Sequence, residues 1–172
     1  MPHPFIVTDG APVLRAVAKP VPKEMFGASE LRRILDRMSE ALRGEPHGVA
    51  IAAPQIGESL RIFVVRGYII KDEEKNDTTP DVAFINPVFV RQSKKKEVLN
   101  EGCLSVPGIY GEIERSVRAT VRAQDEKGKK FERGGSGLLA EIFEHEIDHL
   151  EGKLFIDRAT NLHKTRDTDE KK

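Results

Sequence analysis

The chain has one cysteine, no net charge and no long apolar run, and each absence excludes a class of protein. A single cysteine, Cys103, cannot form an internal disulfide, so its thiol is free to bind a metal. Lysine plus arginine and aspartate plus glutamate both number 28, which leaves no overall field to attract DNA. No segment approaches the ~20 apolar residues that span a bilayer, and the N-terminus lacks the pattern of a signal peptide. We therefore expect a soluble, intracellular protein with neither DNA nor a membrane as partner.

The most informative stretch that is present is HEIDH at residues 145–149. Residues four apart in a helix lie on one face, so His145 and His149 can bind one metal ion from the same side. Glu146, beside the first histidine, is then placed as a general base for whatever the metal activates. A surface helix that carries two histidines without a shared function could have the same five-residue sequence. The flanking sequence is therefore needed to separate the two interpretations.

The flanks predict a largely buried helix around this motif. Apolar residues recur near helical spacing from residue 138 to residue 150, and Gly152 is a plausible stop: the apolar positions are Leu138, Leu139, Ile142, Ile147 and Leu150. An unpaired imidazole would be costly in a buried helix, and a metal ion removes that cost.

A tetrahedral site needs a third protein ligand, and the sequence limits its source. Metalloproteases with a third histidine six residues after the second would need histidine where this chain has Phe155. Beyond Ile156 we expect only a short polar tail, from about residue 163, so no downstream helix can supply a glutamate. Cys103 is the remaining candidate. A thiolate, two imidazoles and one open position are typical of a catalytic metal site.

The rest of the pattern predicts one α+β domain over residues 1–172. After a proline-rich extended arm, a helix with Ser29 as a reasonable N-cap runs to about Leu42. Strands are expected at residues 60–65 and 82–90, where Pro87 indicates an edge or a bend, and a hairpin at residues 119–132. We expect antiparallel sheets packed around the buried C-terminal helix. Gln55, the polar exception in a run of small residues, has a carboxamide that can face a developing oxyanion.

Three segments together resemble the signature motifs of peptide deformylase, in order and approximate spacing: GVAIAAPQ at residues 48–55, EGCLS at residues 101–105 and HEIDH at residues 145–149. The resemblance implies an α+β hydrolase that removes the formyl group from the N-terminal formylmethionine of new proteins. It implies nascent polypeptides as substrates, contact with the ribosome near the exit tunnel, and a bacterial-type cytoplasm or an organelle as the compartment.

The resemblance also implies roles for individual residues. Cys103, His145 and His149 would bind one divalent metal, Glu146 would act as acid and base, and Gln55 with the backbone N–H of Leu104 would form the oxyanion hole. The substrate would contact Val49, Ala50, Gly102, Leu138, Glu141 and Ile142. Fe²⁺ would be the metal in the cell, whereas the affinity order of divalent ions favours Zn²⁺ or Ni²⁺ in purified protein.

Four positions depart from the family pattern. Ala50 replaces the second glycine of the first motif, and Glu144 replaces the glutamine often found before the first histidine. Glu141 stands where many relatives have an apolar residue in the methionine pocket, and Tyr110 stands where several carry a basic residue. The alternatives to a deformylase are a generic metallopeptidase, a non-catalytic metal-binding module and a polypeptide-binding protein with an incidental motif.

Overall fold

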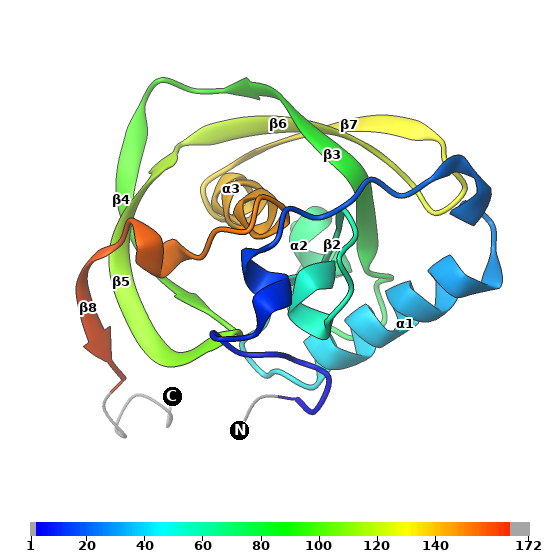
Figure 1. The fold of residues 1–172 in the computed structure, drawn as a ribbon. Helices are drawn as coiled ribbons and strands as arrows, with labels where there is room; N and C mark the ends of the chain where they lie inside the picture. Colours follow the sequence, from blue (N-terminus) through cyan, green and yellow to red (C-terminus); the bar gives the residue numbers. More distant parts are fainter. Residues whose placement is uncertain (1–2, 166–172) are drawn as a thin grey trace.

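Helix α3 (Leu138–Leu150) lies inside a curved wall of strands in the computed structural model, which describes residues 3–165. Figure 1 shows β4 and β5 on one side of α3, β6 and β7 above it, and β2 and β3 on the other side. Nine of its 13 residues are buried, so the prediction of a buried helix between antiparallel sheets is confirmed. Gly152, with φ 73°, follows the C-terminus in the left-handed conformation that glycine tolerates.

The larger sheet has five antiparallel strands in the order β1-β2-β3-β6-β7. They are β1 (Ala50–Ala52), β2 (Ile62–Val65), β3 (Val82–Gln92), β6 (Arg118–Gln124) and β7 (Lys130–Ser136). The hairpin predicted from residue 119 to residue 132 is β6 and β7. All four residues of β2 are buried, which explains its unbroken apolar sequence.

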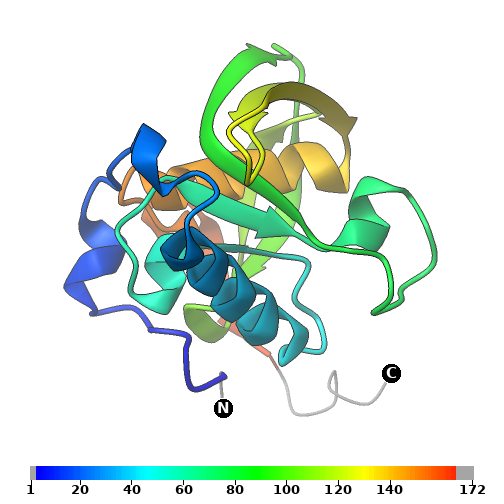
Figure 2. The same cartoon turned by 90° about the vertical axis from the view of Figure 1, so that its right-hand side faces the viewer.

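Two helices cover opposite faces of this sheet at β2. Ile62 and Val64 pack with the buried face of α1 (Ser29–Arg43), whereas Phe63 and Val65 pack with α3, as alternation along a strand requires. Figure 2 shows α1 in front of β2 and α3 behind it. The remaining helical pieces are short: α2 (Gly67–Ile70) and four 3₁₀ turns at Pro12–Arg15, Lys23–Met25, Ala53–Ile56 and Phe155–Asp157. Within residues 3–165, no helix is both long and apolar enough to cross a membrane.

The smaller sheet holds the cysteine. Its order is β4-β5-β8, with β4 (Lys96–Cys103), β5 (Val106–Ser116) and β8 (Thr160–Lys164). The register of β4 against β5 shifts between Gly102 and Cys103. Such an irregularity changes the direction in which a side chain points, and here it lies at the cysteine.

Several sequence expectations were wrong in detail. Pro87 does not mark an edge, because β3 lies between β2 and β6; it lies where the register shifts between Ile85 and Val88, so the interpretation as a bend holds. The N-cap of α1 is Ala28, and Ser29 is the first helical residue. The N-terminal arm contains the 3₁₀ turn Pro12–Arg15.

Two further corrections concern the end of the chain and the start of α3. The prediction of only a polar tail beyond Ile156 is wrong, because Thr160–Lys164 form β8. Most of the tail predicted from about residue 163 falls on residues 166–172, which lie outside the described part. Leu138, expected to be buried, is 47% exposed. It begins α3 at the rim of a cavity rather than in the core.

Candidate metal centre and active site

Three side chains with metal-binding atoms, Cys103, His145 and His149, lie together where the end of β4 meets α3. Their ligand atoms all lie within 4.8 Å of one another. Sγ of Cys103 is 3.3 Å from Nε2 of His149, which is 3.2 Å from Nε2 of His145. The four-residue spacing places both imidazoles on the face of α3 that meets the thiol. The structure thus brings together the three residues that the sequence named as candidate ligands.

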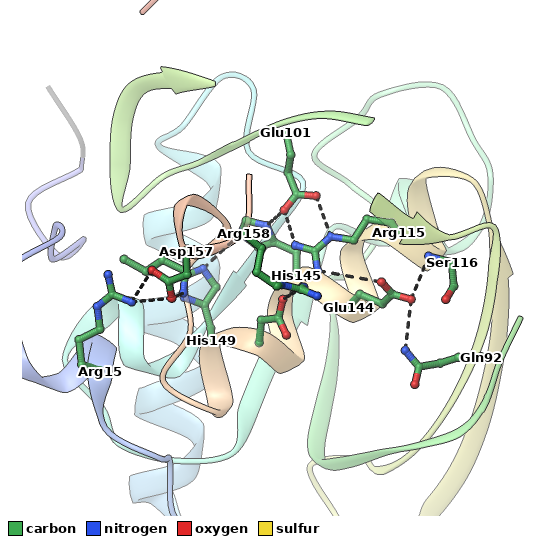
Figure 3. A network of polar contacts seen from close by, with 12 residues as sticks. Arg15, Gln92, Glu101, Arg115, Ser116, Glu144, His145, His149, Asp157 and Arg158 are labelled. Atoms are coloured by element: carbon green, nitrogen blue, oxygen red, sulfur yellow. Dashed lines mark hydrogen bonds and ion pairs between the residues drawn. The ribbon is translucent and has the colours of Figure 1, made fainter. Parts of the chain in front are cut away.

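A buried ion pair holds the first of these histidines. The carboxylate of Glu101 contacts Nδ1 of His145 and accepts hydrogen bonds from Arg115, at 2.6 Å from Nη2 and 3.0 Å from Nε (Figure 3). Burial opposes ionisation of Glu101, but the hydrogen bonds from His145 and Arg115 outweigh it and lower its pKa to about 2. Glu101 is therefore a carboxylate at neutral pH, and it fixes the orientation of the imidazole.

Arg115 extends this network away from the site. Its Nη1 donates to Asp148, 2.8 Å away, and Asp148 also accepts a hydrogen bond from Arg158. Figure 3 shows Glu144 on the far side of Arg115, where it accepts hydrogen bonds from the backbone of Ser116 and from Gln92. No sequence pattern predicts a role for Glu101 or Arg115. Glu101 lies inside the motif at residues 101–105, but nothing near Arg115 in the sequence indicates its partner.

The two histidines differ in their tendency to take up a proton. Burial, together with the charge of His145, holds the pKa of His149 well below its ordinary value. For His145, burial acts in the same direction, but hydrogen bonds to Cys103 and Glu101 outweigh it and raise its pKa. His149 is therefore neutral, which is the form of imidazole that binds a metal.

Glu146 is only 4% exposed, and its Oε2 has no hydrogen-bond partner within residues 3–165. Burial raises the pKa of Glu146 to about 7, against the opposing charge of His145. A buried carboxyl group that changes protonation near neutral pH can both accept and release a proton.

Gln55 lies in the 3₁₀ turn Ala53–Ile56 and is 1% exposed. Its Oε1 accepts a hydrogen bond from the backbone N–H of Ala52 at 2.9 Å. Its Nε2 faces Oγ of Ser105 at 3.2 Å and Sγ of Cys103 at 3.7 Å. The carbonyl side of the amide is therefore held by the backbone, and the N–H₂ side points toward the cysteine.

A cavity of about 450 Å³ opens beside these groups. All six residues expected to contact substrate line it, together with Gln55, Cys103, Leu104, His145 and Glu146; the six are Val49, Ala50, Gly102, Leu138, Glu141 and Ile142. His149 lies behind this lining and is 1% exposed.

Two departures from the family pattern fit the structure without strain. Ala50 of β1 pairs with Val65 of β2 and is 7% exposed, so its methyl group packs in the core beside the cavity. Tyr110 lies opposite Gly102 across β4 and β5, and a Cβ at Gly102 would lie 2.6 Å from the Tyr110 ring. Tyr110 also stacks near His163 of β8, with ring centroids 6.3 Å apart. The absence of a side chain at Gly102 thus leaves room for the ring of Tyr110 in the cavity lining.

Comparison with known proteins assigns the family. Residues 4–165 match the family model described as polypeptide deformylase. The chain belongs to the peptide deformylase family. It is 40% identical to the peptide deformylase of Desulforudis audaxviator over 162 residues, which covers 94% of this chain and 97% of that protein. It is 38% identical to the chloroplastic/mitochondrial peptide deformylase 1A of Arabidopsis thaliana, over 90% of this chain and 61% of that protein.

Solved structures agree with this assignment. The crystal structure of a peptide deformylase from Legionella pneumophila aligns with a TM-score of 0.79 and 39% identity, over 91% of this chain and 85% of that one. The peptide deformylase from Thermotoga maritima aligns with a TM-score of 0.77 and 41% identity, over 90% and 96% of the two chains. The family is metal-dependent and hydrolytic, so the predicted fold, family and enzyme class are confirmed. We therefore set aside the three alternatives: a generic metallopeptidase, a non-catalytic metal-binding module and a polypeptide-binding protein with an incidental motif.

Proposed function

We propose that the chain removes the formyl group from N-formylmethionyl polypeptides, with one divalent metal held by Cys103, His145 and His149 and with Glu146 moving the proton. One observation carries this assignment of roles: three donor atoms from β4 and α3 lie within 4.8 Å of one another beside a cavity that Glu146 also lines. Family membership supports the reaction itself.

The donor set fits a catalytic metal. One thiolate and two imidazoles leave a tetrahedral ion one position for water or substrate, and the chain has no second cysteine to close it. Nδ1 of His145 is occupied by Glu101, so Nε2 is the nitrogen free to bind, and the neutral His149 needs no proton removed. When bound, the metal supplies Lewis-acid chemistry and lowers the pKa of water toward ~7.

Glu146 is the residue that handles protons. Its carboxylate accepts a proton from the attacking water, whose oxygen forms a bond to the formyl carbon. The same proton then passes to the departing nitrogen as the carbon–nitrogen bond breaks. The products are formate and a free amino terminus. A pKa near 7 suits both steps, because neither protonation state is strongly preferred at neutral pH.

Gln55 and Leu104 would stabilise the negative charge that gathers on the formyl oxygen. The Oε1 bond to Ala52 fixes the Gln55 carboxamide, so its Nε2 is already oriented before substrate arrives. Donors that are held in place lose nothing by reorganising during the reaction. The backbone N–H of Leu104, next to Cys103, would be the second donor.

The first side chain of the substrate would occupy the part of the cavity lined by α3. Residues 138, 141, 142 and 145 share one face of this helix, so the lining continues from the proposed reaction centre toward the N-terminus of α3. Val49, Ala50 and Gly102 complete the walls. Leu138 and Ile142 give this region the apolar surface that a methionine side chain requires.

We further propose Fe²⁺ as the working metal, nascent polypeptides as the substrates, the ribosome near its exit tunnel as a partner, and the bacterial cytoplasm or an organelle as the location. A thiolate and two imidazoles bind Zn²⁺ or Ni²⁺ more tightly than Fe²⁺, so purification in air favours those ions. Fe²⁺ and the Cys103 thiolate are both open to oxidation.

The experiment loads metal-free protein with Fe²⁺ or Zn²⁺ under anaerobic conditions and measures formate release from formyl-Met-Ala-Ser. We expect a higher kcat/KM for the Fe²⁺ form, and a loss of this advantage in air. Equal, air-stable rates would reject Fe²⁺ as the preferred metal. A metal-loaded protein that releases no formate would reject the proposed reaction.

A further inference from the structure

We infer that Ser105 is a positioning residue for the reaction, and that its hydroxyl group holds the side-chain amide of Gln55 in the orientation that meets the formyl oxygen. The inference rests on the proposed function, in which Gln55 is one of two oxyanion donors. Ser105 is 0% exposed and is not part of the cavity lining, whereas Gln55 lines the cavity. Ser105 therefore acts on a substrate only through another residue.

The hydroxyl group of Ser105 is the second fixed point of the Gln55 carboxamide. Oε1 of Gln55 accepts a hydrogen bond from the backbone of Ala52 at 2.9 Å, and Nε2 donates one to Oγ of Ser105 at 3.2 Å. The first bond sets which end of the amide faces Ala52, and the second sets how far the amide plane is rotated about that bond. Both side chains are at most 1% exposed, so water does not replace either partner without cost.

The amide nitrogen of Gln55 carries two hydrogen atoms, and Ser105 accepts one of them. The other is directed toward Sγ of Cys103, which lies 3.7 Å from Nε2. Because Cys103 is a proposed metal ligand, this N–H faces the place where the formyl oxygen would lie. An amide that turned away from Ser105 would also turn this donor away from the reaction centre, so the hydroxyl supports the transition state through Gln55.

The N-terminal arm holds Ser105 and Gln55 together, although they lie 50 positions apart in the sequence. The backbone N–H of Val7 donates to the carbonyl of Gln55, and the backbone N–H of Asp9 donates to the carbonyl of Ser105, both at 2.8 Å. Main-chain atoms make both bonds, so they do not depend on the side chain at position 105. A substitution there can therefore remove the hydroxyl group without separating the two segments.

The test is a double-mutant cycle on metal-loaded protein that comprises wild type, Ser105→Ala, Gln55→Ala and the double variant. Formate release from formyl-Met-Ala-Ser gives kcat and KM for each protein. We expect Ser105→Ala to lower kcat about threefold to tenfold with little change in KM, the scale of one hydrogen bond between uncharged groups. In the Gln55→Ala background the same substitution should change kcat by less than about twofold, because the group that it orients is gone.

Two further variants accompany the cycle. Ser105→Thr keeps the hydroxyl group and should retain more of the wild-type kcat than Ser105→Ala; the cycle alone decides if threonine does not fit. Ser39→Ala is the control for loss of a serine hydroxyl, because Ser39 is half-buried in α1 and outside the cavity lining. It should have the wild-type kcat and KM.

Metal content and thermal unfolding are measured on every variant, which separates loss of the metal or the fold from loss of orientation. An equal factor in kcat for Ser105→Ala with and without Gln55 would overturn the inference, because the serine would then act on the backbone or the metal. A wild-type kcat in Ser105→Ala, or a loss of its metal, would also overturn it. Wild-type protein that releases no formate would instead contradict the proposed function, and the inference with it.

Discussion

The carboxylate of Glu101 contacts Nδ1 of His145, although the two residues lie 44 positions apart in the sequence. This contact decides which nitrogen of the ring faces His149 and Cys103. Arg115, 1% exposed, holds the carboxylate from its other side. The metal centre therefore depends on a buried ion pair as well as on the three proposed ligands.

We predict that Glu101→Gln weakens metal binding by about 10-fold to 100-fold, because a hydrogen-bonded carboxylate orients the imidazole and increases its basicity. Competition with a chelator measures the metal dissociation constant. Glu97→Gln, on the same strand with an exposed side chain, is the control and should bind metal as wild type does. An unchanged dissociation constant in Glu101→Gln would mean that His145 is oriented by its helix alone.

The same carboxylate predicts an acid-dependent loss of stability. The pKa of Glu101 is about 2, against an ordinary value of 4.5. A lowered pKa of an acid stabilises the fold above the ordinary value, and this stabilisation disappears as pH falls from about 4.5 toward about 2. The free energy of unfolding of metal-free wild-type protein should exceed that of Glu101→Gln by about 3 kcal/mol near neutral pH, because the variant removes the buried carboxylate that pairs with Nε and Nη2 of Arg115 and leaves only the hydrogen bond from Nη1 to the Asp148 carboxylate. Urea unfolding at decreasing pH should show this difference shrinking; a constant difference would contradict the assignment.

Gln55→Ala should lower kcat by ~10²-fold or more with little change in KM, because an oxyanion donor acts on the transition state. Steady-state kinetics on formyl-Met-Ala-Ser gives both constants. Metal content is measured on the same samples, since Nε2 of Gln55 also approaches Sγ of Cys103. A large increase in KM at unchanged kcat would reassign Gln55 to binding of the ground state.

Glu146→Gln should keep the metal and lose turnover by ~10²-fold or more, because glutamine matches the size of glutamate but cannot transfer a proton. Metal analysis and formate release on one preparation separate the two effects. Loss of metal in proportion to activity would show that Glu146 supports the site rather than the chemistry.

The parts of the fold that the sequence predicted are those with a local signal. The apolar spacing of α3 and the alternation of β6 and β7 are visible within a few residues, because the buried face repeats with the period of the element. The candidate ligands were found in the same way, since the helical spacing of His145 and His149 and the single cysteine limit the choices.

The parts that were missed depend on distant partners. Arg115 occupies an inward position of β5, where a charged residue breaks the apolar pattern. The carboxylates of Glu101 on β4 and Asp148 on α3, both distant in the sequence, make its burial stable. All five residues of β8 are exposed, so its pairing with β5 rests on backbone hydrogen bonds that leave no side-chain pattern. For Pro87 the predicted bend was right and the predicted edge was wrong. An irregularity inside a central strand tolerates proline as well as an edge does, so the residue alone does not separate the two.

The most direct test of the metal centre is the metal content of Cys103→Ala protein purified without air, measured together with its formate release. We predict that this variant folds, holds less than a stoichiometric amount of metal and releases no formate above background, because one of the three proposed ligands is lost. Circular dichroism verifies the fold, and Glu146→Gln prepared in parallel shows that metal is retained when the ligands are intact. A Cys103→Ala protein that carries one metal per chain and deformylates at the wild-type rate would contradict the account.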